Sequence, residues 1–139
     1  MSDLPPGQWS SLLVGHQWPV RDSFSTLALA ATHRRAVGTE FDAYSDLLRS
    51  ARRGALASQV GVTADDVQDA FRTGEMRAHA IADKQRAISN SYEEAHKSVA
   101  ILRSQLSDIA SRGNAEIRQI QASKDPAVSK VAKIVETVI

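Results

Sequence analysis

The apolar residues between Val67 and Ile109 predict one long α-helix. They recur in alternating steps of three and four, which keeps successive side chains on a single stripe of a helix. At 1.5 Å rise per residue such a helix is roughly 65 Å long, and its seven-residue repeat is typical of a coiled coil. The stripe consists of Val67, Phe71, Gly74, Ala78, Ile81, Gln85, Ile88, Tyr92, Ala95, Val99, Leu102, Leu106 and Ile109.

The start of this helix is marked more clearly than its end. Thr63-Ala64-Asp65-Asp66 resembles a capping box, and its acids suit the positive end of a helix dipole. We therefore expect a helix over about 64–112 or beyond. Gly113-Asn114 either ends or bends it, and the return of apolar spacing at Ile117 and Ile120 favours a bend.

A second helix is expected over about 22–52, with Asp22 or Ser23 as its cap. Its apolar stripe is interrupted near Gly38, and a central glycine costs a helix about 1 kcal/mol relative to alanine. We expect a loosened centre there. Residues 54–62 carry a glycine at each end of a short connection. The two helices are thus predicted to form an antiparallel hairpin.

Shorter helices are expected at both ends of the chain. Pro6 and Gly15 fit the first position and the end of a helix over about 6–14. Asp125-Pro126 is typical of a helix start and predicts a helix over about 126–139. Its valines at 128, 131, 135 and 138 share one face. Because β-branched residues are weak helix formers, packing must hold this helix.

The unequal lengths of the hairpin helices leave part of the apolar stripe without a partner. Equal rise per residue places Asp22 opposite roughly Glu94, so the later residues overhang. An exposed Leu or Ile forgoes about 1.5–3 kcal/mol, so we expect the overhang to be covered. The short N-terminal and C-terminal helices are the favoured cover, and a partner helix is the alternative. The fold class is all-α: an elongated hairpin forming one domain over 1–139, or the N-terminal part of a larger protein.

Composition excludes several classes of protein. The chain has 139 residues, 42% of them hydrophobic and 5% aromatic, which suits one small helical domain. Its net charge of +1 and the lack of a basic cluster argue against nucleic-acid binding. The absence of cysteine excludes disulfides and thiolate chemistry. The N-terminus lacks the features of a cleaved signal peptide, and we expect no membrane-spanning segment.

The residues with chemical potential do not combine into a catalytic or metal motif. Glu93 and His96 have the Glu-x-x-His spacing of di-iron bundles, but a single copy on the flank of the stripe favours a solvated face. His79 and Asp83 are four residues apart and are interpreted as a surface hydrogen-bonded pair. No nucleophile elbow or phosphate loop is present. We therefore expect no enzymatic activity, no metal and no cofactor.

Protein–protein contact is the remaining functional class. Tryptophan dominates binding hot spots, which makes Trp9 and Trp18 candidates, although anchoring of the N-terminal segment in the core is the favoured interpretation. The apolar overhang supplies the other candidate partner-binding residues, Val99, Leu102, Leu106 and Ile109.

Leu4-Pro5-Pro6, a short segment and then two long helices resemble the N-terminal helical domains of actinobacterial type VII secretion substrates, the PPE-like and WXG-like proteins. The resemblance covers roughly residues 4–123 and is architectural. It implies export without a cleaved signal peptide, a helical partner or secretion chaperone, and a role in mycobacterial virulence. The Trp-x-Gly turn and the Tyr-x-x-x-Asp/Glu export signal of that superfamily are absent, since Tyr44 is followed four residues on by Leu48 and Tyr92 by His96. A partner would supply the signal in trans.

Two functional hypotheses follow. In the first, the chain is made in the cytoplasm as a helical targeting or interaction domain of a secreted or cell-surface protein, and it docks a helical partner or chaperone. In the second, it is a scaffold protein that self-associates through the same stripe, with Gln85 setting the register.

Overall fold

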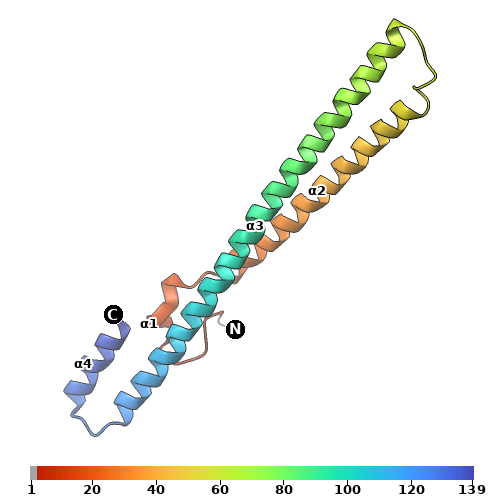
Figure 1. The fold of residues 1–139 in the computed structure, drawn as a ribbon. Helices are drawn as coiled ribbons and strands as arrows, with labels where there is room; N and C mark the ends of the chain where they lie inside the picture. Colours follow the sequence, from red (N-terminus) through yellow and green to blue (C-terminus); the bar gives the residue numbers. More distant parts are fainter. Residues whose placement is uncertain (1–2) are drawn as a thin grey trace. The chain divides into compact units, whose positions relative to one another are not determined.

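The computed structural model describes residues 3–139, and these residues form an all-α fold (Figure 1). The elements in chain order are α1 (Ser10–Val14), the 3₁₀ turn η1 (Gly15–Gln17), α2 (Arg21–Arg53), α3 (Val62–Ala122) and α4 (Ala127–Val138). Contacts divide the chain into two compact units. Thr26–Ala95 is called the hairpin unit here, and the residues up to Ser25 together with His96–Ile139 are called the terminal unit.

The structure confirms the predicted all-α class and the bounds of the helices that follow α1. The two long helices and α4 begin and end within two residues of their expected limits, except that α3 runs ten residues past 112. The N-terminal helix is shorter than expected, because it begins at Ser10 and not near Pro6. The helix ends at Val14, as expected, with Gly15 as its C-cap residue. Its φ of −44° and ψ of −60° are right-handed, and the chain continues into η1.

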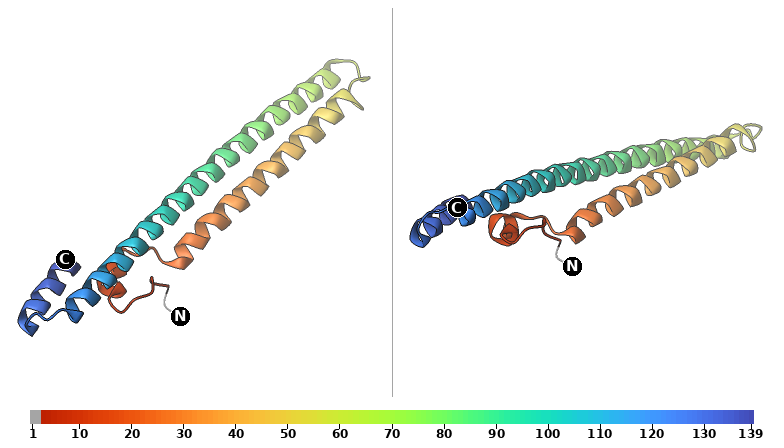
Figure 2. Two further views of the ribbon diagram at one scale, coloured as in Figure 1. Left: turned by 60° about the horizontal axis from the view of Figure 1, so that its bottom comes forward. Right: turned by 90° about the horizontal axis from the view of Figure 1, so that it is seen from below.

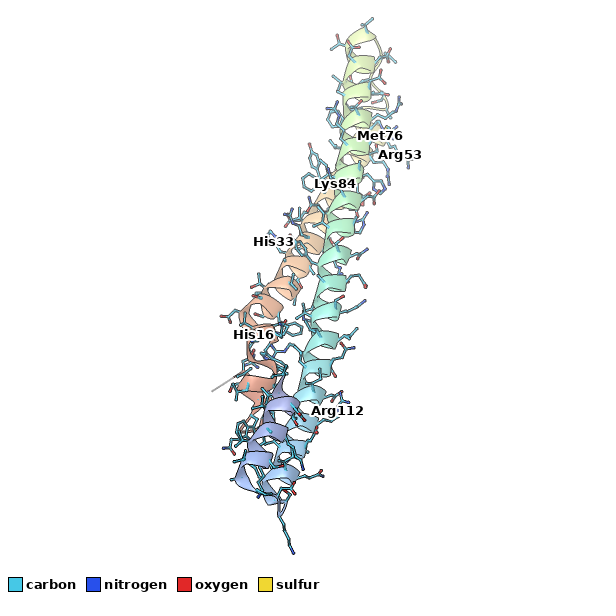
Figure 3. The ribbon with its side chains drawn as sticks, turned by 90° about the vertical axis from the view of Figure 1, so that its left-hand side faces the viewer. His16, His33, Arg53, Met76, Lys84 and Arg112 are labelled. Carbon is cyan, nitrogen blue, oxygen red and sulfur yellow. The ribbon has the colours of Figure 1, made fainter. Side chains whose placement is uncertain are left out.

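In the hairpin unit, α2 and α3 lie side by side in opposite directions (Figure 2). The residues buried between them are small and recur every seven positions on α2, where they are Ala31, Gly38 and Ser45. Ala78, Ala82 and Ser89 are the buried residues of α3 within this unit. Larger side chains such as Met76 and Lys84 project outward (Figure 3).

Hydroxyl groups bond directly from one hairpin helix to the backbone of the other. Ser45 Oγ donates to the Glu75 carbonyl at 3.0 Å, and Ser89 Oγ donates to the Ala31 carbonyl at 2.7 Å. Such contacts require the helix backbones to approach closely, which only small side chains permit. The hairpin is therefore held by close backbone approach as well as by apolar burial.

Gly38 belongs to this close contact, and the expected loosening of α2 around it is wrong. The helix is continuous through Gly38, which is buried. A Cβ added there would lie 3.3 Å from the Ala82 carbonyl oxygen. The glycine weakens α2 by its intrinsic propensity, but the room it leaves lets α3 approach.

The pairing of the two helices is shifted from the expected register. Ser45 pairs with Glu75 and Ala31 with Ser89, so Asp22 falls beyond the predicted partner Glu94. Within the terminal unit, Phe24 stacks on His96 with ring centroids 4.1 Å apart. The prediction placed Arg52 opposite Ala64, at the start of the second helix. In the structure the first turns of α3 lie beside the connection instead, since Gln68 Nε2 donates to the Leu56 carbonyl at 2.8 Å.

Ion pairs flank the hairpin near its turn. Arg49 Nε and Arg52 Nη2 bind the two oxygens of Glu75 at 2.8 and 3.2 Å. Hydrogen bonds from Arg49, and then from Arg52, lower the pKa of the Glu75 carboxyl. Arg86 binds both Asp42 and Asp83, and its bond is the main cause of the lowered pKa of Asp42. Arg49 and Arg52 therefore tie the last turns of α2 to α3.

In the terminal unit, α3 continues through Gly113 and Asn114, so the helix does not end at these residues. Both residues are buried, and both contact the N-terminal segment, residues 3–20. The glycine and asparagine mark a docking site on an unbroken helix.

The helix α4 lies beside the last turns of α3 (Figures 1 and 2), where Glu116 and Ile120 share one shallow cavity with Lys133, Glu136 and Thr137. Asp125 is not its hydrogen-bonded cap; it binds Lys133 Nζ at 2.6 Å, and this bond lowers the pKa of the Asp125 carboxyl. No residue of α4 is buried. Three of the four valines expected to pack are exposed, at 84%, 61% and 49% for Val128, Val131 and Val135.

Candidate functional site

The N-terminal segment covers one face of α3 in the terminal unit. Val14, Leu106 and Ala110 form a buried cluster, exposed by 1%, 9% and 0%. The partly buried residues that pack against this cluster all come from the N-terminal segment and are Leu4, Leu13 and Trp18. The predicted internal cover of the overhang is thus supplied at Leu106 by the N-terminal segment, while α4 lies farther along α3.

Asn114 binds the N-terminal segment through its buried amide. Its Oδ1 accepts the Trp9 backbone N–H at 2.9 Å, and its Nδ2 donates to Ser10 Oγ at 3.1 Å. Nδ2 also donates to the Ala110 carbonyl at 2.7 Å, within the same helix. Gly7, with a φ of +140°, passes so close that an added Cβ would lie 2.4 Å from Nδ2. Only glycine fits there without strain.

Arg103 forms a second attachment for the same segment. Its Nη1 and Nη2 bind the two oxygens of Asp3 at 2.9 and 2.8 Å, and Nη1 also donates to the Pro19 carbonyl at 2.6 Å. The guanidinium carbon lies 4.5 Å from the Trp18 ring centroid. The hydrogen bonds from Arg103 lower the pKa of Asp3 to about 2. The first residues of the segment and its last are therefore tied to one side chain.

The candidate partner-binding residues fall into two groups. Trp9 and Trp18 are partly buried, and Leu106 is buried beneath the segment to which both tryptophans belong. Val99 is partly buried, whereas Leu102 and Ile109 are each 42% exposed. The sequence pattern placed them all on one stripe. The structure separates Leu106, which faces the N-terminal segment, from Leu102 and Ile109 on the flank.

Other exposed apolar residues of the terminal unit were not among the partner-binding candidates named from the sequence. Ile101 is 59% exposed beside Leu102, outside the predicted stripe. On α4 the exposed valines follow steps of three and four, which places them on one helical face. That spacing was visible in the sequence, but the direction in which the face points was not. Arg103 was not singled out from the sequence, and Asn114 was interpreted only as part of a helix end or bend.

The groups considered for chemistry make ordinary structural contacts. Glu93 binds Arg35, and His96 stacks on Phe24. His79 Nδ1 lies 3.2 Å from Asp42 Oδ1, and its Nε2 lies 3.7 Å from Asp83 Oδ2. Across residues 3–139, His, Asp and Glu form no group of three or more that would hold a metal ion. None of the helices in these residues combines the length and apolar character needed to cross a membrane.

The fold and this surface define an all-α protein in which a helical hairpin is joined to a terminal unit with an anchored N-terminal segment. The chain is 39% identical over 132 residues to the uncharacterized protein Rv2082 of Mycobacterium tuberculosis, a match that covers 95% of this chain. It is thus a homologue of a mycobacterial protein, and it spans 18% of the length of that relative. No protein-family model matches the chain, and no solved structure matches it at a significant level.

Proposed function

We propose that the chain is a non-enzymatic helical interaction domain that docks a helical partner protein on its terminal unit. The observation that carries the proposal is the exposure of branched apolar residues there. Six such side chains are each at least 42% exposed to solvent. They are Ile101, Leu102 and Ile109 on α3 and the three exposed valines on α4. Helices with apolar positions three and four apart bind other helices in this way.

The N-terminal segment sharpens the assignment of the docking residues. It already covers Leu106 and Ala110, so these residues hold the domain together and leave no room for a partner. Leu102 and Ile109 lie seven positions apart and share a face of α3, and they are the candidates that remain exposed. The partner surface is therefore proposed to lie on their side of α3 and on the valine face of α4.

We also propose the finer assignment, in which the domain belongs to a protein exported by a type VII pathway together with its partner. The resemblance in helix order and the mycobacterial homologue support it. Since the chain lacks the Tyr-x-x-x-Asp/Glu signal, export would depend on the partner. A tagged chain expressed in a mycobacterium should reach the culture medium, and it should stay in the cells when the type VII ATPase is inactivated. Release that persists without that ATPase would refute the export proposal.

The docking proposal is tested with the double variant Leu102→Asp, Ile109→Asp. Both side chains are substantially exposed, so the variant should keep its helical circular-dichroism spectrum while binding to the cognate partner falls at least tenfold. The control replaces Ser104 and Gln105 by Asp, which adds the same charge at exposed positions of the same helix. Equal loss of binding in both variants, or none in either, would overturn the proposed surface.

Self-association through the same residues is the second candidate function, because the exposed valines of α4 would suit a symmetric contact equally well. Size-exclusion chromatography with light scattering at several concentrations separates the two. A monomer at all concentrations removes self-association. If the wild-type chain forms a stable dimer and the Leu102→Asp, Ile109→Asp variant is a monomer, the surface binds a second copy of the chain and not a different protein.

A further inference from the structure

The helix α2 carries a second stripe in the hairpin unit, on its outer face. Its members alternate in steps of four and three, which is the spacing of a coiled-coil seam. Each member lies two positions from Ala31, Gly38 or Ser45, and two residues turn an α-helix by roughly 200°. The outer stripe therefore faces away from α3, and His33 projects outward from α2 (Figure 3). Its members are Leu29, His33, Ala36, Glu40, Ala43 and Leu47.

Every member of the outer stripe is exposed. Leu29 and Leu47 are 70% and 68% exposed, and Tyr44 beside the stripe is 53% exposed. The two ionisable members, His33 and Glu40, have no side-chain hydrogen bond or ion pair with residues 3–139. Single exposed leucines are common on protein surfaces, but apolar residues that continue one seam over five turns are typical of an interaction surface.

The outer stripe is complementary to itself when two copies of α2 run antiparallel. Because both helices rise equally per residue, positions equally far before and after a two-fold axis face each other. With that axis at the level of Gly38, each long polar side chain faces an alanine, and leucine faces leucine at both ends. The facing pairs are Leu29 with Leu47, His33 with Ala43, and Ala36 with Glu40.

Charge favours this antiparallel arrangement over a parallel one. A parallel pair would set Glu40 against Glu40 of the second copy, and like charges in an interface oppose association. In the antiparallel pair, His33 and Glu40 of the second copy are three residues apart along the axis, which is about 5 Å. These two side chains span such a distance, and the two-fold axis forms the pair twice.

We propose that two copies of this chain associate antiparallel through the outer stripe of α2. A second copy is the occupant because one two-fold axis matches the leucines, the alanines and the His33–Glu40 pair together. The contact runs along about 27 Å of helix and is smaller than a standard protein interface, so we expect a dissociation constant in the micromolar range. The outer stripe belongs to the hairpin unit, and the proposal does not rest on docking at the terminal unit.

Analytical ultracentrifugation of the full chain over a range of concentrations tests the dimer. Leu29→Asp, Leu47→Asp should raise the dissociation constant at least 100-fold, because it brings carboxylates face to face. The control Met76→Asp, Ala87→Asp adds the same charge at exposed positions of α3 and should dimerise like wild type. Wild type that stays monomeric at millimolar concentration, or equal dissociation constants for the two variants, would overturn the proposal.

The same measurement separates this dimer from contacts of the terminal unit. Leu102→Asp, Ile109→Asp should leave the dissociation constant of the dimer unchanged, whether or not that variant still binds a helical partner. A dimer lost in this variant and retained in Leu29→Asp, Leu47→Asp would assign self-association to the terminal unit and refute the role of the outer stripe.

Single introduced thiols test the antiparallel direction, since the chain contains no cysteine. Under oxidation, a mixture of the Leu29→Cys and Leu47→Cys variants should give a disulfide-linked dimer. Each variant alone should not, because its two thiols would lie about 27 Å apart. Cross-linking of each variant with itself, or none in the mixture, would contradict the antiparallel pairing.

Substitutions of His33 test the charge pairing. His33→Lys should keep the dimer at least as tight as wild type, because lysine is attracted to Glu40 of the second copy. His33→Glu should raise the dissociation constant about tenfold through repulsion of that carboxylate. Circular dichroism checks that both variants remain helical. Equal dissociation constants for the two variants would refute the pairing of His33 with Glu40.

Discussion

At the scale of single residues, two polar side chains of α3 hold the N-terminal segment. Asn114 is 6% exposed and bonds to Trp9 and Ser10, and Arg103 binds Asp3 through both terminal nitrogens. Apolar burial alone would let the segment slide along the helix, since it is non-directional. The polar bonds define one position. The two residues contribute specificity of attachment as well as stability.

Replacing Asn114 by Ala should lower the free energy of unfolding by about 1–3 kcal/mol, because the Trp9 backbone N–H and the Ser10 hydroxyl lose their partner. Urea unfolding followed by circular dichroism measures the change. Asn90→Ala is the control, since Asn90 is an exposed asparagine of the same helix. The attachment would be disproved if both variants were equally stable.

The Asp3–Arg103 pair should make stability depend on acid pH. The pKa of Asp3 is lowered from 3.8 to about 2 in the folded chain by the hydrogen bonds from Arg103. The ionised pair therefore stabilises the fold above pH 3.8, and this contribution is lost as the pH falls from 3.8 towards 2. Wild type should exceed Asp3→Asn in urea midpoint above pH 3.8, and the difference should vanish near pH 2. A difference that stays constant across this window would contradict the pairing.

At the scale of elements, the hairpin unit depends on the small size of its buried residues. Ala31, Gly38 and Ser45 meet Ala82 and Ser89, and hydroxyls bond to the opposite backbone. The packing surface is therefore partly main chain. Enlarging one of these side chains should lower the free energy of unfolding more than removing a methyl group elsewhere would. The two helix backbones would have to separate to admit the larger side chain.

Ala82→Leu tests this packing. Ala82 is 0% exposed, and a leucine there should lower the free energy of unfolding by about 1–3 kcal/mol through overpacking. Ala80→Leu, at an exposed position on the same helix, should leave stability close to that of wild type. Thermal unfolding monitored by circular dichroism distinguishes them. Equal melting temperatures would show that the helices are not in close contact.

The periodicity of apolar residues predicted the helices well, because each long helix must bury one continuous stripe. It misjudged Gly38, Gly113 and Asn114, since glycine and asparagine signal helix weakness when only local propensity is considered. Their roles come from a second element lying against them. Contacts between residues more than a hundred positions apart, such as Trp9 with Asn114, leave no local pattern.

At the scale of the whole molecule, the two ends of the chain contribute unequally to the fold. The N-terminal segment supplies buried residues and covers Leu106, whereas α4 contains no buried residue. The exposed candidate residues could not be separated from Leu106 by sequence, because the side of α3 taken by the N-terminal segment depends on its tertiary contacts. The terminal unit is thus built asymmetrically around α3.

Deletion of each end measures this asymmetry. Removing residues 1–20 should expose Leu106, at a cost of about 1.5–3 kcal/mol for that side chain, and should increase binding of a hydrophobic dye. Removing residues 124–139 should change both quantities less. Equilibrium unfolding and dye fluorescence of the two truncated chains provide the comparison. If the C-terminal deletion lowered stability and raised dye binding more than the N-terminal deletion, α4 and not the N-terminal segment would be the main contributor to the terminal unit.

The contact between Gly7 and Asn114 has a consequence for evolution. An alanine at position 7 would collide with the asparagine amide, and an alanine at position 114 would remove that close contact, while the φ of +140° at Gly7 would continue to favour glycine. We therefore expect the two positions to be selected together, although 106 residues separate them in the printed chain. Homologues that keep this N-terminal attachment should retain both residues together, and lineages that abandon it are free to lose both. The pair is a two-letter signature by which an anchored N-terminus can be recognised in sequences alone.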